Sequence, residues 1–274
     1  MKMPVLFVGH GSPMNAIEQN RFTATLADLG EKLPKPKAVC VVSAHWVTRG
    51  SEVLTVAQPR TIHDFYGFPR PLFEVQYPAP GARTEAERVA RELEIHPDET
   101  WGFDHGAWSV LLHLYPRADI PVFQLSLDEG SSLARHVELG RELASLRERG
   151  VLILGSGNIV HNLGRLEGDK NANPYPWTVE FDAKVRNAIE TRDVGSLAAP
   201  EHWGKPLAAL AHPTLEHYVP LLYCMGSTDE NDAVSYPYEG FEYGSISMRM
   251  AMFGGAVRRD AVIGADSRQN MISL

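Results

Sequence analysis

The chain has 274 residues, of which 44% are hydrophobic and 22% charged, with a formal net charge of −8, as is usual for a soluble globular protein. A mildly acidic chain without clustered Lys and Arg is not expected to bind nucleic acid. Its longest apolar runs fall short of the roughly 20 residues that span a bilayer, and the N-terminus lacks a signal-peptide pattern. We therefore expect a cytoplasmic protein that does not bind a membrane.

Short apolar runs predict the buried strands of a sheet that is covered on both faces. These runs are residues 4–9, 37–44, 120–125 and 151–155. Residues 51–57 alternate more between polar and apolar types and predict an outer strand. Residues 241–250 alternate as well and predict a last strand.

Amphipathic helical patterns lie between these strands, and Thr214 is a candidate N-cap for the last of them. The helical ranges are 15–33, 83–93, 133–149, 178–191 and 215–225. Strands that alternate with helices predict an α/β fold with a central, mostly parallel or mixed sheet flanked by helices. Without a Gly/Ser-rich linker or a repeat, one domain over residues 1–274 is expected. The long irregular segments 58–81 and 162–177 are expected to be functional loops.

Four of the eleven histidines stand at comparable places in this pattern. His10, His45 and His161 follow predicted strands, and His217 lies in the first turn of a predicted helix. A lone histidine of this kind is more simply explained as a hydrogen-bonded, partly buried residue. Ligands of open α/β sheets bind outside the carboxyl ends of the strands, so four such placements favour one shared metal site there. Neutral imidazole is a common ligand of zinc and iron.

Three more residues are candidates for this site. Glu216 could supply a carboxylate in place of a histidine, but neighbours on a helix diverge by about 100°, so Glu216 and His217 are not both expected to be ligands. His105, in a Gly-Phe-Asp-His-Gly segment, is a candidate acid/base or substrate-binding residue. His63, on the loop 58–81, is a candidate to line the pocket.

The chain resembles the class III extradiol ring-cleavage dioxygenases, in the branch called 4,5-DOPA extradiol dioxygenase-like. The resemblance covers nearly the whole length and rests on an ordered set of segments, not on one motif. The segments are 9–15 (GHGSPMN), 42–46 (VSAHW), 61–65 (TIHDF), 77–81 (YPAPG), 101–106 (WGFDHG), 156–162 (SGNIVHN) and 213–218 (PTLEHY).

The resemblance implies an α/β fold with one divalent non-haem metal per chain, held by His10, His45 and His217. The residue matching His161 faces the same centre, as a fourth ligand or as the acid/base. Ring cleavage calls for Fe(II), whereas zinc is the other metal described in this branch. The usual extradiol site has two histidines and one carboxylate, which keeps Glu216 open as an alternative ligand.

The expected reaction opens the ring of a catechol, DOPA-like in this branch, with O₂. We expect His161 to accept and return the catechol proton, assisted by His105, because imidazole titrates near neutral pH. Trp46 and Tyr218, with His63, are the candidate substrate contacts. Phe65, Tyr66 and Trp108 are further candidates for an aromatic wall. The partners are a small catechol and O₂, in a monomer or small homo-oligomer.

Other functions fit parts of the sequence. A zinc-dependent hydrolase would use the same histidines, because zinc with an open position activates water. A tetrapyrrole chelatase shares only a strand followed by Gly-His-Gly-Ser. A binding module that has lost its chemistry would not be expected to keep every site residue.

Overall fold

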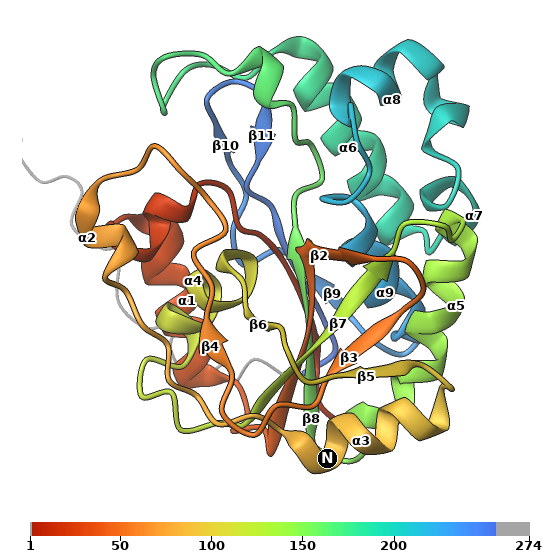
Figure 1. The fold of residues 1–274 in the computed structure, drawn as a ribbon. Coiled ribbons are helices and arrows are strands. Elements are labelled where there is room, and N and C mark those ends of the chain that lie inside the picture. Colours follow the sequence, from red (N-terminus) through yellow and green to blue (C-terminus); the bar gives the residue numbers. More distant parts are fainter. Residues whose placement is uncertain (1, 256–274) are drawn as a thin grey trace, which may run out of the picture.

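The architecture rests on one mixed sheet of eight strands in the order β5-β3-β7-β2-β8-β1-β12-β9, seen in a computed structural model that describes residues 2–255 (Figure 1). Its strands are β1 Val5–Gly9, β2 Ala38–Thr48, β3 Glu52–Leu54, β5 His96–Asp98, β7 Val122–Asp128, β8 Val151–Gly157, β9 Val234–Ser235 and β12 Met250–Phe253. Two small ladders pair β4 Arg60–Thr61 with β6 Gly102–Phe103 and β10 Phe241–Glu242 with β11 Ile246–Ser247.

The centre of the sheet is a parallel block, β7-β2-β8-β1, while β3 and β12 pair antiparallel on its two sides. Parallel strands present their carboxyl ends at one edge of the sheet. Side chains alternate between the two faces of such a strand. In β1, Val5 and Phe7 belong to one apolar cluster, and Leu6 and Val8 belong to the other. The expected α/β fold is thereby confirmed.

Helices cover both faces of the sheet (Figure 1). Buried side chains of α3, α5, α6 and α9 complete one cluster, and those of α1 and α4 complete the other. The helices are α1 Arg21–Lys32, α2 Arg70–Phe73, α3 Arg83–Glu92, α4 His105–Leu114, α5 Leu133–Leu143, α6 Pro176–Glu190, α7 Val194–Leu197, α8 Lys205–Ala211 and α9 Val219–Gly226. No helix in the described part of the chain is both long and apolar enough to cross a membrane.

Three sequence predictions near the edge of the sheet were wrong. β2 does not end before His45 but continues to Thr48, with an irregular register against β7 between Val42 and Val47. Residues 241–250 are not one strand, because a hairpin, β10 and β11, precedes β12. The last helix starts at Val219, so Thr214 is not its N-cap and His217 lies in the turn before it.

Candidate metal centre

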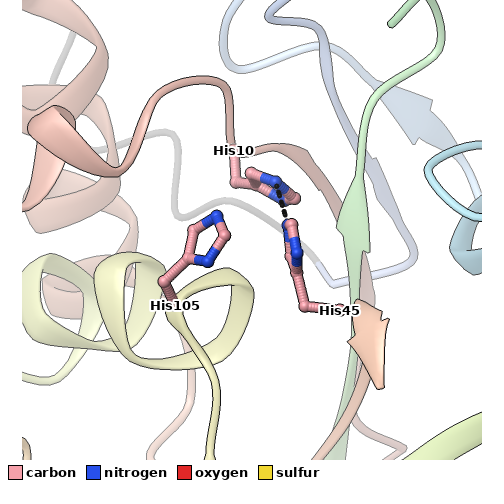
Figure 2. Close-up of side chains that lie close together, drawn as sticks. All are labelled: His10, His45 and His105. Atoms are coloured by element: carbon pink, nitrogen blue, oxygen red, sulfur yellow. Dashed lines mark hydrogen bonds between the residues drawn. The ribbon is translucent and has the colours of Figure 1, made fainter. Parts of the chain in front are cut away.

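Five histidines from five different segments line one cavity of about 580 Å³. His10 follows β1, His45 lies in the irregular part of β2, and His105 is the first residue of α4. His161 comes four residues after β8, and His217 precedes α9. Figure 2 shows His10, His45 and His105 pointing toward one another from their separate elements. The convergence expected from the strand-end pattern is therefore present, with His105 as an additional member.

The imidazole rings lie at distances that suit a shared cation. His10 Nε2 and His45 Nε2 are 3.1 Å apart (Figure 2). The ring centroids of His45 and His105 are 3.8 Å apart, and those of His45 and His217 are 4.9 Å apart. Possible ligand atoms of His10, His45 and His105 all lie within 4.8 Å of one another, and the same holds for His161, Glu216 and His217. Without an intervening ion, the Nε2 atoms of His10 and His45 would face each other.

Hydrogen bonds to Ser156 fix the tautomer of His10. The Ser156 hydroxyl donates its only proton to the Gly106 carbonyl at 2.6 Å. Its oxygen must therefore accept the second bond, 2.9 Å long, from His10 Nδ1. With the proton on Nδ1, the Nε2 lone pair of His10 is free at the centre of the cluster.

Asp64 orients two histidines at once. Its Oδ2 accepts a bond of 2.9 Å from His105 Nδ1 and lies 3.5 Å from His45 Nδ1, while Oδ1 accepts the His105 backbone N–H. Burial tends to raise the pKa of Asp64, but the hydrogen bonds from His105 and the charges of His105 and His45 outweigh it and lower that pKa. An ionised Asp64 holds the proton of His105 on Nδ1 and leaves Nε2 facing the cavity.

His217 is positioned by its backbone and by Glu216. The His217 carbonyl accepts the Asn158 N–H at 2.8 Å, and a Cβ on Gly157 would lie only 2.1 Å from that oxygen. Glycine at 157 thus permits the close approach of the turn to β8. Although Glu216 and His217 are adjacent, their side chains touch: Glu216 Oε1 lies 3.2 Å from His217 Nδ1 and also accepts the Thr214 hydroxyl.

His161 is held differently from the other four. Its ring stacks on that of His217, with centroids 3.5 Å apart and planes 8° apart. Its backbone N–H bonds to the Ala211 carbonyl, but within residues 2–255 its imidazole has no hydrogen-bond partner. No hydrogen bond within this range fixes the tautomer of His161, whose side chain lines the cavity.

Burial keeps the imidazoles of four of these histidines neutral, namely His10, His45, His161 and His217. Desolvation, reinforced by neighbouring histidines, lowers the pKa of His10 and of His217 well below the usual value. Desolvation and His105 lower the pKa of His45 against the opposing charge of Asp64. Desolvation lowers the pKa of His161 to about 4. Neutral imidazoles offer lone pairs, so this donor set suits a divalent cation such as zinc or iron.

The start of α4 is locked against β2. Asp104 caps the helix through the Ala107 N–H and accepts the Ser43 hydroxyl at 2.6 Å and the Gln124 amide at 2.8 Å. Burial, followed by the charge of Asp64, raises the pKa of Asp104. These bonds place His105 opposite His45.

The rest of the cavity wall comes largely from the two long loops. Phe65 and Tyr66, both expected in an aromatic wall, lie there with Phe68 and Asp64 from the loop 58–81. Leu163 and Leu166 come from the loop 162–177. The hairpin adds Tyr243 and Ile246, and the prediction of a single strand over 241–250 gave no reason to expect them at the cavity.

The three candidate substrate contacts are not among the described residues that line the cavity. Trp46 is 3% exposed and stacks on Trp101. Tyr218 is fully buried, with its hydroxyl bonded to the Leu197 carbonyl, and His63 Nε2 bonds to the Val75 carbonyl. Trp108, the other expected aromatic wall residue, is buried as well and bonds to the Ile62 carbonyl. Strand alternation turns Trp46 to the opposite face from His45, so a direct contact of Trp46 with the substrate stays a prediction.

Two functional positions were missed although their segments were noticed. Asp64 stands beside His63 in the segment 61–65, and Ser156 lies between two glycines. Neither segment signals a hydrogen bond to a histidine far along the chain. Partners of this kind follow from the tertiary fold.

Comparisons with known proteins agree with this arrangement. Residues 4–254 match the family described as the catalytic LigB subunit of aromatic ring-opening dioxygenase. The chain belongs to this family and is a metal-dependent extradiol ring-cleaving dioxygenase.

Among individual relatives, it is 45% identical over 258 residues to the Escherichia coli K12 protein called 4,5-DOPA dioxygenase extradiol, covering 92% of this chain and 95% of the relative. It is 36% identical to the protein of the same name from Beta vulgaris, covering 88% of this chain and 92% of the relative. The crystal structure of an uncharacterized protein from Escherichia coli K12 superposes with a TM-score of 0.79 at 40% identity, covering 92% of this chain and 100% of that one.

Proposed function

We propose that this enzyme opens the ring of a catechol, with DOPA as the first substrate to test, at the five-histidine cavity. The observation that carries the proposal is the convergence of imidazoles on one point of a cavity large enough for a single aromatic ring. The names of the relatives suggest DOPA. Family membership favours oxygenase chemistry over the zinc hydrolase that the sequence left open.

We propose His10, His45 and His217 as the metal ligands, with His161 at a fourth position beside them. The free Nε2 of His10, 3.1 Å from that of His45, supports this set. Glu216 Oε1 is engaged by Thr214 and His217, which supports an orienting role for it and not a place among the ligands. Bound there, iron(II) would bring the two catechol oxygens and O₂ together and carry electrons between them.

The protein's own part in the reaction is to move protons and to exclude water. His105 has the arrangement of a general base, since Asp64 holds its Nδ1 and leaves Nε2 free toward the cavity. His161, unbonded and neutral, can accept the second catechol proton or return it to the product. The structure thus supports a larger part for His105 than the assisting role expected from the sequence. Phe65 and Phe68 shield the site from water.

The test is oxygen uptake by protein prepared without metal and then loaded with either iron(II) or zinc. With DOPA or another catechol, the iron form should consume O₂ and form a ring-opened product with a new visible absorption, whereas the zinc form should do neither. His45→Ala should abolish uptake, and His63→Ala, outside the cavity, should retain it. Absence of uptake with verified iron loading across a panel of catechols would contradict the proposal.

A further inference from the structure

One lysine ties the loop 162–177 to two other segments of the chain. The Lys170 ammonium donates to Glu18 Oε2 at 2.5 Å and to Asn15 Oδ1 at 3.1 Å, and it lies 3.3 Å from Glu242 Oε1. An ammonium has three protons, so these three oxygens can accept all of them. The Lys170 side chain is 24% exposed and that of Glu242 is 10% exposed, so water screens this cluster less than it screens a surface ion pair. The loop is therefore held more firmly than an exposed pair would hold it.

Asn15 connects this lysine to the backbone of His10. Asn15 is 2% exposed, and while its Oδ1 accepts from Lys170, its Nδ2 donates to the His10 carbonyl at 3.3 Å. The Asn15 carbonyl accepts a bond of 2.8 Å from His113 Nε2, which fixes Asn15 against α4. One buried side chain thus separates Lys170 from a proposed metal ligand.

The backbone of Lys170 supports another part of the cavity wall. Tyr243, which lines the cavity, has a φ of 51°, in the left-handed region that residues with a side chain seldom adopt. Its N–H donates to the Lys170 carbonyl at 2.9 Å, and its carbonyl accepts the Glu167 N–H at 2.9 Å. A strained conformation of this kind persists where the surrounding structure holds it. The loop that supplies Leu163 and Leu166 to the wall therefore also holds Tyr243 in it.

We propose that Lys170 is a positioning residue for the substrate, because it holds the wall formed by Leu163, Leu166 and Tyr243 in a fixed place relative to His10. Lys170 is not among the described residues that line the cavity, so it acts through this wall and does not touch the substrate. The inference rests on the proposed ring-cleavage function, since it takes a catechol as the ligand that the wall contacts. Contacts made equally with the bound substrate and with the transition state change KM and leave kcat nearly unchanged.

Lys170→Met tests this role, because it removes the ammonium and keeps a side chain of similar length. On iron-loaded protein, we expect the KM for DOPA, and the dissociation constant of DOPA measured without oxygen, to rise by about tenfold, while kcat falls by less than about twofold. The matched control is Lys184→Met on α6, where the ammonium pairs with Glu180 of the same helix. This control should leave all three constants unchanged. A Lys170→Met protein with an unchanged KM, or with a lower kcat at unchanged KM, would overturn the inference.

A second variant removes the effect of an unpaired charge. Glu242 is 8% exposed, so Lys170→Met leaves a buried carboxylate without its cation and can lower stability for that reason alone. Lys170→Met combined with Glu242→Gln removes both charges. We expect the KM for DOPA to stay raised in this double variant. A KM that returns to that of the unmodified protein would show a merely structural role for Lys170.

A double-mutant cycle tests the route through the wall. Leu166→Ala shortens a wall side chain on the same loop and should weaken DOPA binding without oxygen. In the Lys170→Met protein, where the wall is no longer held, Leu166→Ala should have little further effect, because coupled sites are not additive. A combined fold-change equal to the product of the two single fold-changes would overturn the route through this wall.

Hydrogen exchange separates this inference from the function on which it rests. The backbone N–H groups of Glu167 and Tyr175 bond to the hairpin carbonyls of Tyr243 and Gly244, so Lys170→Met should speed their exchange, and Lys184→Met should not. If exchange is faster and DOPA binds more weakly but no catechol is cleaved in air, the role of Lys170 holds and the ring-cleavage proposal fails. If catechols are cleaved but neither exchange nor DOPA binding changes in Lys170→Met, ring cleavage holds and this inference fails.

Discussion

Single hydrogen bonds decide which nitrogen each histidine offers to the cavity. The Ser156 hydroxyl oxygen accepts a hydrogen bond from His10 Nδ1, and the Asp64 carboxylate accepts one from His105 Nδ1. The Glu216 carboxylate lies beside His217 Nδ1. In each case the partner contacts Nδ1, so Nε2 remains available toward the centre of the cavity. Groups that orient metal-binding histidines in this way fix the tautomer and raise the basicity of the ligand.

Asp64 offers the sharpest test at this scale, because one carboxylate contacts two of the five histidines. Asp64→Asn keeps the shape but removes the charge and one acceptor oxygen. We expect metal affinity to fall by about 10–100-fold, as for other groups that orient metal ligands. Competition against a chelator of known affinity measures this directly.

The control for this variant is Asp169→Asn, a change at an exposed aspartate on the loop 162–177. It should bind metal as the unmodified protein does. Asp64→Asn with the same affinity as this control would show that Asp64 does not position the ligands.

Elements position the site in ways that the sequence predicts only in part. The apolar runs located β1, β2, β7 and β8, and with them the edge where His10, His45 and His161 gather. They did not reveal that β2 passes through an irregular register at His45, because such bulges depend on the partner strand. For the same reason the turn that carries His217 was taken for a helix: its shape is set by contact with Gly157, far away in the sequence.

The packing of α4 on β2 gives an element-scale prediction. A Cβ at Gly106 would lie 2.5 Å from Ser43 Oγ and 3.0 Å from His45 Cδ2. Helix propensity alone favours Ala over Gly by about 1 kcal/mol, but overpacking costs typically about 1–3 kcal/mol. We expect Gly106→Ala to lower the melting temperature and to weaken metal binding.

Gly168→Ala is the matched control, because an added Cβ there meets nothing within 4 Å. It should leave both the melting temperature and metal affinity unchanged. A Gly106→Ala protein as stable as the control would mean that α4 and β2 have more freedom than this packing implies.

Across the whole molecule, the buried neutral histidines couple stability to pH. Burial lowers the pKa of His161 to about 4 and that of His212 to about 3, and it also lowers the pKa of His10, His45 and His217. The unfolded chain takes up protons near pH 6.5, where the folded protein does not. Stability is therefore full above about pH 6.5 and falls as the pH drops, by up to about 1.4 kcal/mol per unit for each such histidine.

Thermal melts of the metal-free protein between pH 7.5 and 4.5 test this coupling. The melting temperature should fall steadily below about pH 6.5. His161→Gln should make the fall shallower, whereas His96→Gln, at an exposed position, should not change it. A melting temperature that does not vary over this range would contradict the neutral state of the histidines.

The central claim is that the five-histidine cavity inserts O₂ into a catechol ring, and isotope labelling tests it most directly. Iron-loaded protein is allowed to turn over a catechol under ¹⁸O₂, the product is reduced at once so that its aldehyde oxygen does not exchange with water, and its mass is measured. We predict a ring-opened product that carries two labelled oxygen atoms, formed by the unmodified protein and absent with His45→Ala. An unlabelled product, or one with an intact ring, would contradict the account.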